Sequence, residues 1–413
     1  MTTSLQTDPQ RTTFTTAAQA VAFSLLIVAT PAGADELKVN GLIQLWATGT
    51  LDSVLTSAVP PPNTYYDLRR EFASDTFSVR RAELAFSGHV DRRVGFRVMV
   101  DPSIGALSSD VLQDALISVD LAGGLVFRAG QMKTLQTYEG LESSARLALV
   151  ERGQLTRRFG DVRDRGVTLS WDRAGRRPLL VSLGVFNGAG KANDANGAKD
   201  VAFRVECGIA TAHRLGAYGL RGSTDQPRDR AVPLDMAGAA APTPDAVLKA
   251  ADTTSQAGAF YLFDKGGFEA ALEVLTGRLG RRHASLGTSP GPARREHVEQ
   301  RLFGFQATAK YAQGRHQMAA RYDRLDYNAG GRWYTDHDPY RESGQGAARD
   351  GDFTPVFTEL SLGYTLAFDA ADRAAANFKV AYVSRVGGFL ISSPSGRVTR
   401  SRASLVAALQ VAF

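Results

Sequence analysis

The feature that most constrains the fold of this chain is an alternation of long and short gaps between segments of strand character. From about Leu37 to the end of the 413 residues, roughly sixteen segments alternate apolar and polar residues with a period of two, which predicts β-strands. The short gaps lie at 89–91, 122–123, 173–177, 264–266, 312–314 and 369–372, and the long gaps at 51–75, 131–165, 224–255, 278–299, 328–354 and 387–398. Tight turns on one rim and long loops on the other are expected of an all-β, transmembrane antiparallel β-barrel, with short periplasmic turns and long extracellular loops.

The last predicted strand indicates which side chains face lipid. One face carries Leu405, Ala407, Leu409, Val411 and Phe413, and the other carries Ser404, Ala408 and Gln410. The same parity recurs at 94–101, 114–121, 125–128, 201–206, 303–311 and 376–382, whereas the faces of 213–223 are ambiguous. A charge that faces lipid near the midplane costs about 2–4 kcal/mol, so the charged residues of these segments should face water.

The N-terminal region predicts export across a membrane. Residues 17–34 form one short apolar stretch after Arg11 and end in the small residues Ala32, Gly33 and Ala34. This pattern predicts a signal peptide over 1–34 and a barrel domain over 35–413, with an uncleaved anchor as the alternative. Cys207 is the only cysteine, so an internal disulfide framework is excluded.

Arginine dominates the basic residues of the chain. Of the 48 basic residues only eight are lysine, and the formal net charge is +6. The planar guanidinium suits carboxylate or phosphate ligands, but a GC-rich genome would give the same excess of arginine. Composition therefore permits anion binding without requiring it.

Several motifs follow one another in a fixed order along the chain. They are SVRRAELAFSG at 78–88 with MVD at 99–101, DALI at 114–117 with GQMK at 130–133, ER at 151–152 with RDRGV at 163–167, GVFNGAG at 184–190 with NGAKD at 196–200, and LQVAF at 409–413. In this order they resemble the phosphate-selective porin O/P family over nearly the whole mature chain. The resemblance implies a sixteen-stranded barrel in the bacterial outer membrane, in contact with lipid and lipopolysaccharide. It also implies a homotrimer that passes small anions such as phosphate by passive diffusion.

The resemblance further implies that 131–165, after the fifth strand, folds inward as a constriction loop. Rings of arginine or lysine attract anions in a narrow pore. The candidate pore-lining, anion-attracting residues are Arg81, Arg97, Arg128, Lys133, Arg146, Arg152, Arg157, Arg158, Arg163 and Arg204. The alternative is that they pair with nearby acids and hold the loop to the wall.

These features predict a passive, anion-preferring diffusion channel. The alternatives are a general or sugar-passing porin with weak charge selectivity, or a non-transport barrel such as an adhesin or enzyme. The G-x-S-x-G string at 287–291 has no flanking strand and helix pattern, and the six histidines lack metal-ligand spacing. We therefore expect no enzyme activity, no cofactor, no metal and no nucleic-acid partner.

Overall fold

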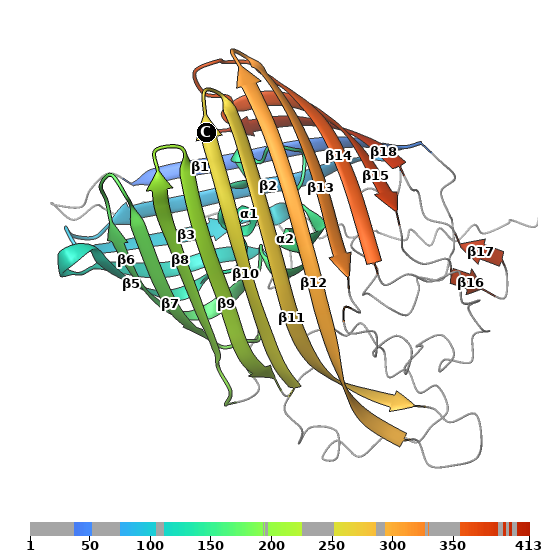
Figure 1. Cartoon of the computed structure of the whole chain (residues 1–413). Helices are drawn as coiled ribbons and strands as arrows, with labels where there is room; N and C mark the ends of the chain where they lie inside the picture. The colour runs from blue at the N-terminus through green and yellow to red at the C-terminus, as the bar shows by residue number, and fades with distance from the viewer. Residues whose placement is uncertain are drawn as a thin grey trace, which may run out of the picture.

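The chain forms a closed antiparallel β-barrel in a computed structural model (Figure 1). The structure describes residues 37–51, 75–104, 111–192, 194, 197–224, 252–285, 294–326, 329, 356–386, 391–393, 396–398 and 403–413. The predicted signal peptide over 1–34 lies outside these residues. Sixteen of the described strands close the ring, and β1 pairs with β18 to complete it. The predicted fold class is therefore confirmed.

The barrel strands follow one another around the ring in chain order. Their bounds are β1 Lys38–Thr50, β2 Thr76–His89, β3 Val94–Val100, β4 Leu112–Asp120, β5 Leu125–Lys133, β6 Arg163–Arg173, β7 Leu179–Phe186, β8 Asp200–Ala210, β9 His213–Thr224, β10 Asp252–Lys265, β11 Phe268–Ser285, β12 Arg294–Gln313, β13 His316–Asp326, β14 Val356–Ala367, β15 Ala376–Val386 and β18 Ala403–Ala412. A separate hairpin joins β16 Ile391–Ser393 to β17 Gly396–Val398. This order makes every barrel connection a simple step between neighbours.

Strands extend into several of the expected long gaps. The gap expected at 278–299 is wrong in its bounds, because β11 and β12 remain paired from Leu279 with Gln300 to Ser285 with Arg294. Main-chain pairing continues there although the sequence is strongly polar, which is why the alternation did not reveal it. In the same way, β5 extends to Lys133 and β6 begins at Arg163, so the ends of 131–165 are strand.

The predicted face assignments agree with side-chain exposure. On β18, Leu405 and Leu409 are exposed, whereas Ala408 and Gln410 are buried in the interior. Successive strand residues point to opposite faces, so this pattern sets the orientation of each strand. The faces of β9, which the sequence left ambiguous, follow the same rule, and Tyr218 is buried.

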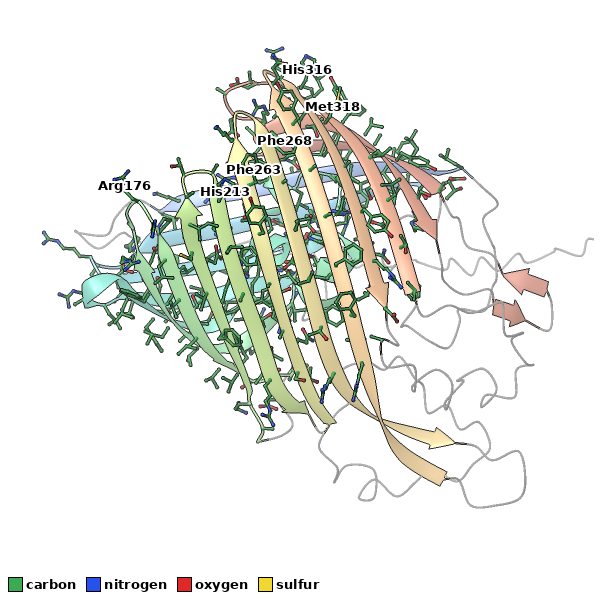
Figure 2. All side chains as sticks on the ribbon, viewed as in Figure 1. Arg176, His213, Phe263, Phe268, His316 and Met318 are labelled. Atoms are coloured by element: carbon green, nitrogen blue, oxygen red, sulfur yellow. The ribbon has the colours of Figure 1, made fainter. Side chains whose placement is uncertain are left out.

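Aromatic side chains cluster at the end of the barrel where the short turns lie (Figure 2). His213 contacts Phe263 with ring centroids 5.1 Å apart, and Phe263 contacts Phe268 at 6.0 Å. Nearby, the His316 ring nitrogen lies 2.7 Å from the hydroxyl of Tyr364. Amphipathic rings at this level are typical of the aromatic girdle of a membrane barrel.

Candidate functional site: a loop inside the barrel

The connection between β5 and β6, residues 134–162, lies inside the ring of strands and is called the interior loop below (Figure 1). Its first helix, α1 Tyr138–Leu141, follows Thr137, whose hydroxyl accepts a hydrogen bond from the Gly140 amide at 3.0 Å. Its second helix, α2 Gln154–Phe159, ends at Gly160. A Cβ on Gly160 would collide with the Thr137 side chain, so glycine lets the two helices approach closely.

Main-chain carbonyls of the interior loop accept hydrogen bonds from inward side chains on many strands. A buried carbonyl without a donor costs about 1–3 kcal/mol, so these bonds satisfy groups that the short helices leave open. The pairs are Lys379 with Leu147 at 2.9 Å, Gln410 with Ala145 at 2.9 Å, Gln44 with Ser144 at 3.4 Å, Gln317 with Ala148 at 3.1 Å and Arg204 with Thr137 at 3.0 Å. The loop is thereby attached to β1, β8, β13, β15 and β18.

One flank of the interior loop is bonded tightly to the wall around β11–β14, and we call it the bonded side. Arg321 on β13 is buried and lies at its centre. Its guanidinium lies 3.2 Å from Glu139 of the loop, 3.3 Å from Asp323 and 3.5 Å from Glu359. It also donates to the main-chain oxygen of Glu151 at 2.8 Å. One strand arginine thus compensates three buried carboxylates.

The second helix completes the bonded side. Arg157 pairs with Glu359 at 2.9 Å, and the Gln154 amide donates to Asp323 at 2.5 Å. At the first helix, the main-chain N–H of Tyr138 donates to Glu273 of β11 at 2.6 Å. Buried charges are tolerated only when paired and hydrogen-bonded, so this network fixes the position of the loop against the wall.

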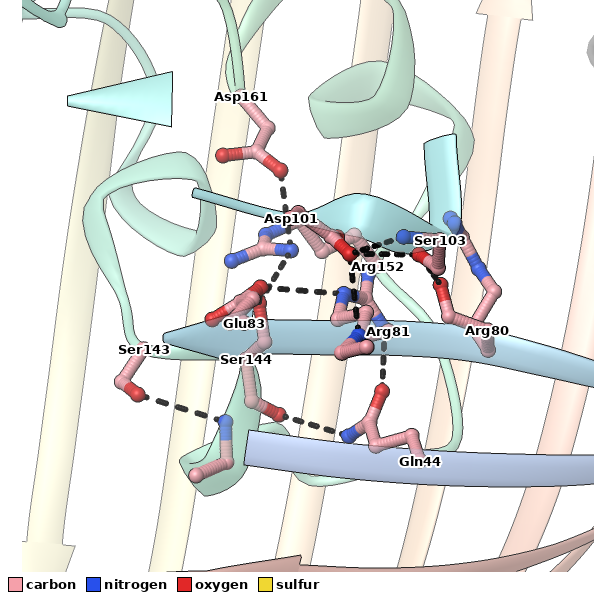
Figure 3. A network of polar contacts seen from close by, with 12 residues as sticks. Gln44, Arg80, Arg81, Glu83, Asp101, Ser103, Ser143, Ser144, Arg152 and Asp161 are labelled. Atoms are coloured by element: carbon pink, nitrogen blue, oxygen red, sulfur yellow. Dashed lines mark hydrogen bonds and ion pairs between the residues drawn. The ribbon is translucent and has the colours of Figure 1, made fainter. Parts of the chain in front are cut away.

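A β-bulge brings two consecutive arginines to the same loop carboxylate. Successive strand residues normally face opposite ways, but the β1–β2 pairing shifts register beside Gln44 and leaves Arg80 as the extra residue. Arg80 lies 2.6 Å and Arg81 2.8 Å from Glu151, and Arg81 also donates to Gln44 at 2.6 Å. Figure 3 shows Arg81, Gln44 and Ser144 in this network.

The ends of the interior loop are joined by a second cluster of charges. Asp161 lies 2.8 Å from Lys133, 3.1 Å from Arg152 and 3.6 Å from Arg163 (Figure 3 draws the contact with Arg152). The Arg152 side chain is 1% exposed and also donates to the main-chain oxygen of Glu142 at 2.8 Å. These contacts close the loop at its base.

The loop carboxylates remain ionised because cations surround them. Burial raises the pKa of Glu151, but Arg80, Arg81 and Arg152, with the main-chain N–H of Arg152, together lower it more, so the pKa lies well below its usual range. Burial likewise raises the pKa of Asp161, and Arg152 with the other neighbouring cations brings it below its usual value. Both groups therefore carry full charge at neutral pH.

The opposite flank of the interior loop faces a cavity of about 350 Å³ against β2–β6, and we call it the cavity side. Four basic and three acidic side chains line this cavity. The basic residues are Arg97, Arg128, Lys133 and Arg163, and the acidic residues are Glu83, Asp114 and Glu142. The local excess of positive charge is therefore small.

Within the cavity, the cations differ in how fully they are compensated. Asp114 is shared by Arg97 at 3.0 Å and Arg163 at 2.8 Å. The Arg97 side chain is 39% exposed. Arg128 contacts the hydroxyl of Ser170 at 3.4 Å, and in the described part of the chain no carboxylate lies within ion-pair distance of it. Arg97 and Arg128 are thus the cations best placed to meet a solute.

The remaining predicted residues are dispersed. Arg204 is buried beside Glu206 at 2.7 Å and over the Phe260 ring at 4.8 Å, away from the cavity lining. Arg158 lies over the Phe159 ring at 5.6 Å. Arg146 is exposed, and no ion pair joins it to another described residue. The cavity brings together four of the ten candidates: Arg97, Arg128, Lys133 and Arg163.

Sequence reasoning missed several residues that hold the loop. Arg80 was not a candidate because alternation places it outward, and only the bulge reverses that. Arg321 and Lys379 lie on inward positions of their strands, so period-two parity could have found them as interior cations. Their loop partners are distant in sequence and carry no local signal.

No group of three or more histidine, cysteine or acidic side chains in the described residues is arranged to hold a metal ion. No helix in the same residues is long and apolar enough to cross a membrane.

Comparison with known families finds a match over part of the chain. Residues 64–239 match the family described as phosphate-selective porin O and P, which confirms the predicted resemblance. The matched range contains all of the quoted motifs except the C-terminal 409–413. Among the sequences of curated proteins, none matches the chain.

Solved structures share the fold. The outer-membrane channel DcaP of Acinetobacter baumannii is 12% identical with a TM-score of 0.55, and the match covers 92% of this chain and 98% of that chain. The trimer form of OmpT, an outer-membrane protein of Vibrio cholerae, is 10% identical with a TM-score of 0.54, covering 92% and 100%. An anion-selective porin from Comamonas acidovorans is 10% identical with a TM-score of 0.53, covering 92% and 99%. The family match and the shared barrel support an outer-membrane channel.

Proposed function

We propose that this chain is a passive outer-membrane diffusion channel for small hydrophilic solutes, with a modest preference for anions. The observation that carries the anion preference is the cavity side of the interior loop, where Arg128 has no acidic partner among the described residues and Arg97 shares Asp114 with another arginine. Cations in a narrow, weakly screened passage raise the local concentration of anions.

The preference is modest because pairing removes most of the positive charge. Four of the candidate arginines are buried beside acids or carbonyls, so they attach the interior loop and do not attract solutes. They are Arg81, Arg152, Arg157 and Arg204. A solute must also leave the pore, and a site in which one arginine lacks an acidic partner among the described residues binds weakly enough to release it.

The interior loop would act as the constriction of this channel. In this proposal solutes pass the loop on the cavity side, because hydrogen bonds attach the loop to β8, β15 and β18 and the cavity lies against β2–β6. We further propose that three copies assemble as a homotrimer in lipid and lipopolysaccharide, and that the chain has no enzymatic activity. The trimer form of OmpT has the same barrel fold, and this shared fold is what supports the proposed trimer.

A reversal-potential measurement tests this function. The purified full-length chain is reconstituted in a planar bilayer under a KCl gradient. Stepwise conductance with chloride somewhat more permeant than potassium is expected. Absence of stepwise conductance would contradict the channel, whereas a preference for potassium would contradict only the anion selectivity.

The nearly balanced charge of the cavity also favours a second candidate, a general or sugar-passing porin. Four basic residues face three acidic residues on its lining. Proteoliposome swelling separates the two candidates. Equal rates for neutral sugars and for anionic solutes of the same size would favour the general porin.

A further inference from the structure

The cavity side has an apolar face that a channel for inorganic ions does not need. Leu116 of β4 and Leu135 and Leu141 of the interior loop are half-buried and line the cavity. The buried side chains of Met99 and Met132 are also part of the lining. Leu116 and Leu135 pack against an apolar cluster inside the barrel that includes Met132. Apolar surface thus reaches the solute space from both the wall and the loop.

Strand register places this apolar surface between the two accessible arginines. Leu116 is paired directly with Arg97 on β3, and the next inward residue of β4, Ser118, is paired with Arg128 on β5. On its β5 side Leu116 faces Gly130, which has no side chain. Directly paired residues in a sheet lie close enough for side-chain contact, as Arg97 and Leu116 do, whereas Arg128 lies diagonally across from Leu116 on the other neighbouring strand.

We infer that this cavity selects organic monocarboxylates with an apolar body, such as an aromatic acid, over inorganic phosphate. The carboxylate would lie against Arg128 and Arg97, and the apolar body against Leu116 and Leu135. A cavity of about 350 Å³ is at the small end of the range of ligand pockets, about 300–1,000 Å³. The inference rests on the proposed function and names its substrate class.

Two physical arguments favour one negative charge and an apolar body. Removing apolar surface from water is favourable, and only a solute with such a body gains from covering the leucines. The three carboxylates on the lining, Glu83, Asp114 and Glu142, oppose a second negative charge on the solute. Phosphate near neutral pH is partly a dianion, which the lining carboxylates repel, and it has no apolar surface to cover the leucines.

Current block in a planar bilayer tests the inference. Benzoate, acetate and inorganic phosphate are added at pH 7.5 to full-length channels conducting KCl. Benzoate and acetate carry the same carboxylate, and only benzoate has a large apolar body. We expect benzoate to halve the current at a concentration about tenfold lower than acetate or phosphate, a difference equivalent to about 1.4 kcal/mol.

Substitutions separate the two halves of the site. Leu116→Ser is expected to reduce the benzoate-to-acetate ratio severalfold, and Leu135→Ser tests the same face from the loop if the wall variant fails to assemble. Arg128→Gln is expected to weaken the block by both carboxylates equally, and Arg128→Lys to retain most of it. Leu121→Ser is the matched control, because Leu121 is exposed beside the turn after β4 and does not line the cavity.

The possible outcomes distinguish this inference from the proposed function. Channels that conduct KCl but respond equally to benzoate and acetate would overturn the inference alone. The same holds if both leucine variants assemble and leave the ratio unchanged. A wild-type chain that carries no KCl current would overturn the proposed function and the inference with it.

Discussion

The two flanks of the interior loop use similar residues in opposite ways. On the bonded side, Arg321 and Arg157 are buried against carboxylates of the wall and the loop. On the cavity side, Arg97 stays partly exposed, and among the described residues Arg128 hydrogen-bonds to a hydroxyl and to no carboxylate. The same residue type is therefore an attachment on one flank and a solute contact on the other.

The difference shows that a count of arginines does not measure the field in the pore. A buried arginine paired with carboxylates adds little to the potential that a solute meets, because its partners cancel its charge at short range. The potential that a solute meets depends on the ratio of acidic to basic side chains exposed to the pore. That ratio is close to one in the cavity and leaves a small positive excess.

The largest effect is expected on barrel stability when Arg321, at the centre of the bonded side, is substituted. Arg321→Ala leaves Glu139, Asp323 and Glu359 buried without their shared cation, which should destabilise the barrel by about 3–5 kcal/mol. Unfolding in urea, followed by heat-modifiable electrophoretic mobility, measures the loss. Arg315→Ala, at an exposed turn, is the control and should change stability by less than about 0.5 kcal/mol. Equal effects of the two variants would contradict the assigned role.

The next largest effect is expected at low pH, where protonation of Glu151 and Asp161 weakens the attachment of the interior loop. The folded pKa values of Glu151 and Asp161 lie below their usual values of 4.5 and 3.8. Groups of this kind stabilise the folded state above the usual pKa, and the contribution disappears as pH falls through the lowered folded pKa. The contribution of Glu151 and Asp161 to the loop attachment should therefore be constant from about pH 5 to 8, and the open-channel noise that this contribution suppresses should appear only in stronger acid.

A matched variant identifies the group responsible for the acid effect. Glu151→Gln removes the charge that compensates Arg80 and Arg81, so its noise at pH 7 should resemble that of the wild type in strong acid. If the noise of Glu151→Gln at pH 7 equalled that of the wild type at pH 7, Glu151 would not be responsible for the acid effect.

A smaller effect is expected on the cavity side. Arg128→Gln removes a cation that has no described acidic partner, so the chloride-to-potassium permeability ratio should fall roughly two- to fourfold. Stability should change little, because in the part of the chain that the structure describes Arg128 makes one side-chain hydrogen bond, a long one of 3.4 Å to the Ser170 hydroxyl. Bilayer reversal potentials measure the ratio, and an unchanged ratio would remove Arg128 from the solute path.

The smallest effect is expected at Arg146. Its side chain is exposed in a turn of the interior loop and outside the cavity lining, so Arg146→Gln should change the same permeability ratio by less than about twofold. A change as large as that of Arg128→Gln would mean that solutes pass on the other flank of the loop.

The barrel itself was predictable because period-two alternation is a local property. The polar and apolar faces of β18 could be identified from the sequence, and so could the inward direction of Arg97 and Arg128. Strand ends in polar sequence, as at 279–285, were missed because main-chain pairing does not require apolar side chains.

The sequence did not predict which arginines attach the interior loop and which contact solutes. This difference depends on a bulge at Arg80 and on partners such as Glu359, which lies 202 residues from Arg157. Nothing near Arg157 in the sequence distinguishes an attachment from a solute contact. Only the arrangement of strands around the loop separates the two roles.

The bonds between the interior loop and the last strands have a consequence for assembly. Leu147 and Ala145 accept hydrogen bonds from residues 232 and 265 positions later in the chain. Contacts of such long sequence separation form late, because the intervening chain must first be ordered. The interior loop therefore reaches its final position only when the barrel closes. In an incompletely folded barrel the loop would still be cleaved by protease.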